Sequence, residues 1–207
     1  MAFKGSTGTY WERLFAQNGN GNSLAGNSGA GTATLLSKQS STYPLPVLDA
    51  GYFQPHYGVS KTVRVTARGV ISFASAATPQ TFSGFGVFFA GSDTTTIGTA
   101  ICQTGTVTPV ASQAVSNAIW ELECDITANS VGTSGAMAAF GLLTIAQPTL
   151  TLGAAPVMNA IGLGGTATVS VNTENAQYIQ IGFTWTNANT SASNTVTCYQ
   201  VYVDATD

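Results

Sequence analysis

Regular alternation of apolar and polar residues is the feature of this sequence that most restricts its fold. From Trp120 to Ile126 every even position is apolar and every odd position is acidic. A strand with this pattern buries one face and leaves the other outside the core. The stretch 61–68 alternates in the same way and places Arg64 and Arg68 at polar positions. No long stretch has apolar residues at helical spacing, so the sequence predicts an all-β protein.

Turn-forming residues between the alternating stretches predict how the strands connect. Asn, Ser and Gly residues join 118–128 to 135–146, which are predicted to form a hairpin. The Asn- and Ser-rich segment between 178–186 and 195–203 predicts a second, C-terminal hairpin. Further strands are expected over 11–16, 33–36, 69–73, 81–89, 96–103 and 166–171. We therefore expect a single antiparallel β-sandwich domain over residues 1–207, of jelly-roll type.

Two expected strands carry finer detail. Gly84 and Gly86 interrupt an aromatic strand, which predicts a bulge or a close approach of two backbones. In the last strand, alternation predicts that one face carries Thr197, Tyr199, Val201 and Val203.

The charged residues are few and are concentrated on two of the predicted strands. Charged side chains make up 7% of the chain, against about 25% in ordinary soluble domains. With a net charge of −3 and no long basic run, a nucleic-acid partner is not expected. No apolar stretch is long enough for a membrane-spanning helix, and residues 1–9 do not resemble a signal peptide. The nearly neutral stretches 14–37 and 126–173 are where we expect contacts between subunits.

The acidic row invites three interpretations. Glu121, Glu123 and Asp125 lie on one face of one predicted strand, with neighbours about 7 Å apart. Carboxylates can serve glycoside hydrolysis or bind calcium. The pattern favours instead a strand face that pairs with a basic one, and we predict Arg64 and Arg68 as the cross-strand partners.

Other chemistry-bearing residues point to no catalytic, cofactor or metal site. His56 is the sole histidine and lies in a Pro-bearing apolar loop, where a packed side chain is favoured over a general base. The three cysteines show no CxxC spacing, so we expect buried thiols in a protein made in a reducing cytosol. The glycines of 161–165 are not followed by the lysine of a phosphate-binding loop.

Two segments stand out as candidate contact regions. Residues 17–31 are rich in Gly and Asn and are predicted to form a flexible arm that becomes ordered on docking. An aromatic, Pro-containing loop supplies the candidate partner contacts Tyr43, Tyr52, Phe53 and Tyr57, because tyrosine is common at protein interfaces.

Several short motifs resemble those of small virion structural proteins of tailed bacteriophages, notably phages of actinobacteria. The matching stretches are Arg13–Gln17, Val63–Ile71, Ala118–Thr127, Val131–Gly135, Phe183–Thr186 and Ser191–Thr195. The resemblance implies a jelly-roll-like sandwich that decorates or reinforces a capsid and has no catalytic residues. It further implies a homo-oligomer that contacts the major capsid protein or other virion proteins, after synthesis in the bacterial cytoplasm. Segments 18–31 and 43–57 depart from the family pattern.

Two other functional classes remain open from the residues alone. A receptor-binding or carbohydrate-binding module of a tail fibre or tail appendage would place aromatic rings in a groove with polar partners. A glycan-degrading enzyme would need a second acidic residue across a cleft from the acidic row.

Overall fold

The computed structural model describes residues 11–18, 23–25, 33–37, 45–54, 61–77, 80–94, 96–109, 114–147, 157–163, 169–186 and 191–206. These residues form strands and no helix. The strands are β1 (Trp11–Asn18), β2 (Ser23–Ala25), β3 (Ala33–Leu35), β4 (Val47–Leu48), β5 (Thr62–Phe73), β6 (Phe82–Ala90), β7 (Thr99–Gln103), β8 (Val115–Ser130), β9 (Gly135–Gln147), β10 (Val157–Leu163), β11 (Val169–Val171), β12 (Gln177–Trp185) and β13 (Thr195–Thr206).

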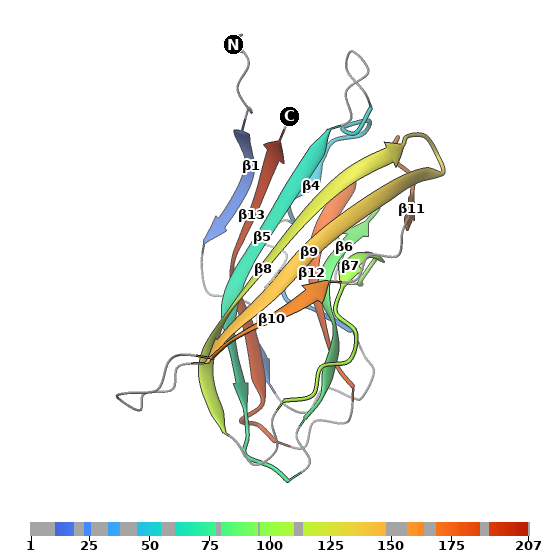
Figure 1. Ribbon diagram of the computed structural model, residues 1–207. Coiled ribbons are helices and arrows are strands. Elements are labelled where there is room, and N and C mark those ends of the chain that lie inside the picture. Colours follow the sequence, from blue (N-terminus) through green and yellow to red (C-terminus); the bar gives the residue numbers. More distant parts are fainter. Residues whose placement is uncertain are drawn as a thin grey trace.

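The strands form two antiparallel sheets packed face to face (Figure 1). The large sheet has the order β1-β13-β5-β8-β9-β10, with β2 on β13 and β11 on β9. The small sheet has the order β3-β12-β6-β7, with β4 on β12. The predicted all-β sandwich is therefore confirmed, although this strand order does not by itself confirm the jelly-roll connection.

The inward faces of the two sheets meet in an aromatic core. Along β8 the even residues from Trp120 to Ile126 are at most 1% exposed, as their alternation predicts. The ring of Phe85 in β6 meets Trp120 edge-on at a centroid distance of 4.7 Å. In β12, Phe183 and Trp185 meet at the same distance. Burying each such side chain contributes about 1.5–3 kcal/mol, so this layer holds the two sheets together.

Glycine shapes the strand that carries the Phe cluster. Gly84 has a φ of +60°, a conformation that side chains with a Cβ adopt at a cost. Gly86 lies against β7, where an added Cβ would collide with the carbonyl oxygen of Cys102. The predicted close backbone approach is therefore confirmed at Gly86.

The first predicted hairpin is confirmed and the second is wrong. Strands β8 and β9 pair across a short turn, with Glu121 opposite Thr144. Strands β12 and β13 do not pair with each other: β12 pairs with β6 in the small sheet, and β13 pairs with β5 in the large sheet. Both bury one face, as Ile181 and Val203 are each 0% exposed. Alternation is satisfied equally by strands side by side and by strands facing each other across a core, so the pattern did not distinguish them.

The predicted face of the last strand is also interrupted. The register of β13 against β5 shifts between Cys198 and Gln200. Cys198 and Val201 are therefore both buried, whereas Tyr199 between them is 43% exposed. A bulge of this kind moves one residue out of the alternation, and Tyr199 does not share the inward face of Val201.

Part of the predicted arm belongs to the large sheet. Residues 17–18 end β1, and residues 23–25 form β2, which pairs with β13. The other residues of the predicted arm lie outside the part of the chain that the structure describes.

Candidate functional site

The outer face of the large sheet carries the predicted ion pairs. Arg64 lies opposite Asp125 in the register of β5 and β8, and Arg68 lies opposite Glu121. Arg64 donates from Nε to Asp125 Oδ1 at 2.7 Å and from Nη2 to Oδ2 at 2.8 Å. Arg68 donates from Nε and Nη2 to Glu121 Oε1 at 3.0 and 2.6 Å. Both predicted cross-strand pairs are confirmed.

These contacts keep both guanidinium groups charged. The hydrogen bond with Asp125 raises the pKa of Arg64, against a smaller opposing effect of burial. The hydrogen bond with Glu121 raises the pKa of Arg68 in the same way. The two-pronged geometry at Arg64 matches the fork of a guanidinium to both carboxylate oxygens, so this pair fixes both side chains.

The third carboxylate of the row has no such partner. Glu123 lies between the two ion pairs on β8 and is exposed. Thr66 of β5 is opposite it on one side and Leu142 of β9 on the other. Glu123 makes no hydrogen bond or ion pair in the part of the chain that the structure describes. Its carboxylate is therefore the one in the row that no arginine neutralises.

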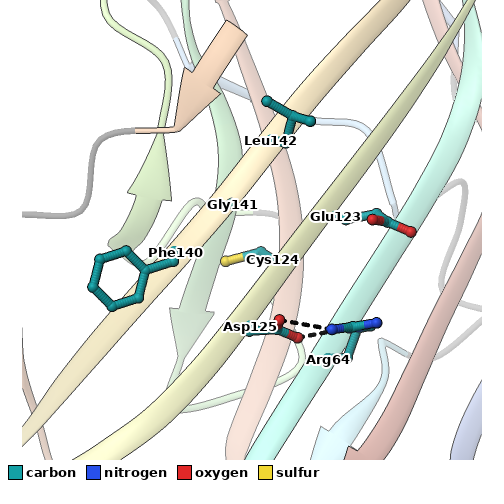
Figure 2. Close-up of a pocket in the computed structure, with 7 residues that line it drawn as sticks. All are labelled: Arg64, Glu123, Cys124, Asp125, Phe140, Gly141 and Leu142. Carbon is teal, nitrogen blue, oxygen red and sulfur yellow. Dashed lines mark hydrogen bonds and ion pairs between the residues drawn. The ribbon is translucent and has the colours of Figure 1, made fainter. Parts of the chain in front are cut away.

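Two exposed apolar side chains border the same carboxylates. Phe140 of β9 lies opposite Asp125 and is 80% exposed. Leu142, opposite Glu123, is 43% exposed. Together with Arg64, Glu123, Asp125 and the backbone around Cys124 and Gly141, they line a shallow hollow of about 280 Å³ (Figure 2). We call this surface the ionic face, and define it by Arg64, Arg68, Glu121, Glu123, Asp125, Phe140 and Leu142.

Sequence reasoning identified the charged half of the ionic face but not its apolar half. Phe140 and Leu142 lie in a nearly continuous apolar stretch, so periodicity does not reveal which residues point outward. The register of the predicted β8–β9 hairpin would have found them. Counting residues outward from its turn along both strands places Phe140 opposite Asp125 and Leu142 opposite Glu123. Both lie within the stretch 126–173 where subunit contacts were expected.

The aromatic loop contributes less exposed surface than expected. Phe53 is 2% exposed, and its ring lies 6.3 Å from that of Phe89 in the core. It therefore does not present a ring to a partner in this structure. Tyr52 is partly buried against the core, with the Lys61 Nζ 4.8 Å from its ring centroid. Tyr43 and Tyr57, like His56, lie outside the described residues.

All three cysteines are buried thiols, as expected. Burial raises the pKa of Cys198 to about 12. Contact with the Cys102 thiol, together with burial, raises the pKa of Cys124, whose side chain points inward beneath the ionic face. Among the described residues, no group of three or more His, Cys, Asp or Glu side chains is arranged to hold a metal ion.

The outer face of the small sheet differs because the chain itself covers it. Gln180 of β12 is 0% exposed beside Thr94, Thr96 and Gly98. Its Nε2 donates to the carbonyl oxygen of Thr96 at 3.0 Å and to that of Thr94 at 3.4 Å. Its Oε1 accepts from the Gly98 N–H at 2.9 Å. The open candidate site is therefore the ionic face of the large sheet.

Comparison with known proteins adds no relative. No protein-family model, no curated protein and no solved structure matches the chain. In the described part of the chain, no helix has the length and apolar character needed to cross a membrane.

Proposed function

We propose that this protein is a structural component that assembles with other proteins through the ionic face. The observation that carries the proposal is the ring of Phe140, 80% exposed beside a hollow on a sheet face that the described residues leave open. Exposed apolar side chains surrounded by polar ones are typical of protein contact surfaces. The opposite outer face, covered at Gln180, offers no comparable surface there.

We further propose that the assembly is the virion of a tailed bacteriophage, in which the protein decorates or reinforces the capsid beside the major capsid protein. The support is the resemblance of the sequence motifs, together with a 7% content of charged residues that suits close packing against neighbours. Counting the copies of this chain per purified particle, by quantitative mass spectrometry against the major capsid protein, tests the proposal. We expect hundreds of copies; a few copies would indicate the tail, and absence from the particle would contradict the proposal.

A carbohydrate-binding module of a tail appendage is the second candidate. It is favoured by the position of the Phe140 ring next to the hollow, with Arg64, Glu123 and Asp125 as polar neighbours. Sugar-binding sites combine a ring with hydrogen-bonding groups in this way. Binding to a glycan array that is lost in Phe140→Ser would support this function over capsid decoration.

A further inference from the structure

One carboxylate of the ionic face, Glu123, is left without an arginine partner. The ionic face as defined holds three carboxylates (Glu121, Glu123, Asp125) and two guanidinium groups, and Asp204 of β13, opposite Arg64, also contributes to the raised pKa of that arginine. Asp125 occupies the fork of Arg64, and Glu121 accepts two hydrogen bonds from Arg68. Glu123 is the carboxylate left over, and it lines the hollow (Figure 2). The surface that complements this hollow must therefore bring a positive charge.

The apolar border of the hollow adds a second requirement. Two apolar residues of β9 lie opposite the carboxylates of β8: Leu142 is across from Glu123, and Phe140 is across from Asp125. Long cationic side chains cover apolar surface with their methylene groups while the charged end stays at a polar partner. A cation near the exposed face of a phenylalanine ring gains further attraction. A lysine or arginine side chain can pair its charged end with Glu123 while its methylene groups pack on Phe140 and Leu142.

We propose that the ionic face binds a lysine or arginine side chain of a partner protein, carried on a segment whose neighbouring residues are apolar. The cationic end pairs with Glu123, and the flanking residues pack on Phe140 and Leu142. This inference deepens the proposed assembly function and rests on it, because it specifies the chemistry of the partner. A second copy of this chain fits less well, since two ionic faces in contact would bring their surplus carboxylates together.

The test is a selection from a displayed random peptide library on the immobilised full-length protein. We expect enriched peptides to share a Lys or Arg flanked by apolar residues, and to bind more weakly as salt is raised. Affinities of the best peptides are then measured by calorimetry on variants. Glu123→Gln and Phe140→Ser should each weaken binding about tenfold.

Matched controls use residues away from the hollow. Glu174→Gln removes an exposed carboxylate in the turn before β12, and Val131→Ser removes an exposed apolar side chain in the turn before β9. Both should leave affinity within about twofold. Because all four changed residues are exposed, thermal melting should report the same fold for every variant.

Several outcomes would overturn the inference. Enriched peptides without a basic residue, equal binding to Glu123→Gln, or no enrichment at all would each do so. Glycan binding or self-association that is lost in Phe140→Ser, without any basic peptide bound, would assign the face to a sugar or to a second copy. These results are independent of the particle copy number, so failure of the virion proposal and failure of this inference are distinguishable.

Discussion

The two outer faces of the sandwich treat polar groups in opposite ways. On the large sheet, Arg64 and Asp125 pair as ions that remain about one-third and two-fifths exposed. On the small sheet, the outward-facing Gln180 has a neutral amide instead. It is 0% exposed, and backbone groups satisfy its hydrogen bonds. An amide can be buried once its hydrogen bonds are made, whereas an ion loses far more hydration. Of these two polar sites, the charged one is therefore the one that water still reaches.

The largest predicted effect comes from ionising a buried group, the thiol of Cys198 in β13 of the large sheet. Burial raises the pKa of Cys198 from 9.0 to about 12. The unfolded chain therefore releases this proton at lower pH than the folded one, and the stabilisation present below pH 9 is lost as pH rises toward 12. The loss should reach about 4 kcal/mol at the upper end. Urea unfolding between pH 8 and pH 12 measures it.

Cys198→Ala provides the control for the high-pH experiment. This variant has no thiol at position 198 to ionise, so its free energy of unfolding should fall less steeply above pH 9 than that of the natural chain. Identical slopes would mean that Cys198 ionises as readily in the folded as in the unfolded protein.

Removing the buried amide should produce the next largest effect. Gln180→Ala leaves the Gly98 N–H and the carbonyl of Thr96 without their partner. Each buried group left unsatisfied costs about 1–3 kcal/mol, and we expect about 3 kcal/mol in all, measured by urea unfolding. Gln54→Ala, which removes an exposed amide, should change stability by less than about 0.5 kcal/mol. Equal effects of the two variants would mean that the hydrogen bonds of Gln180 with Thr94, Thr96 and Gly98 do not stabilise the fold.

The outer face of the small sheet is also closely packed at Gly182 of β12. A Cβ at Gly182 would lie 2.5 Å from Phe88 Cε2 and 3.0 Å from Ile97 Cδ1. Gly182→Ala should therefore destabilise the protein by about 2 kcal/mol through overpacking, seen as a lower melting temperature. Gly105→Ala, where nothing lies within 4 Å of the added atom, should have almost no effect. An unchanged melting temperature in Gly182→Ala would show that Phe88 and Ile97 move aside at little cost in stability.

The smallest effect is expected at the ionic face. A double-mutant cycle of Arg64→Ala and Asp125→Ala should give a coupling of about 0.5 kcal/mol. The coupling should shrink further in 1 M salt, because exposed ion pairs are screened. A coupling of several kcal/mol that salt leaves unchanged would mean that the pair behaves as a buried one, and the contrast between the two faces would fail.

The success of the sequence in predicting the ion pairs has a specific physical cause. Alternation fixes which face of a strand a residue occupies, so Arg64 and Asp125 could be assigned to polar faces from their positions in the chain. Alternation does not say which strands are neighbours, and the pairing of β12 with β13 was predicted wrongly for that reason. Alternation also does not show whether an outward-facing side chain is exposed to water or is covered by another part of the chain. Gln180, between Ile179 and Ile181, therefore gave no sign of its burial.

The position of β13 has a consequence for how this protein is made. This strand lies inside the large sheet between β1 and β5 (Figure 1), and its Ala205 is opposite both Glu12 and Val63. While the ribosome is still adding residues 195–206, the nascent chain has neither closed this sheet nor covered the edge of β5. Such unpaired edges are prone to mispairing with other chains. The large sheet can therefore close only after residues 195–206 have emerged from the ribosome.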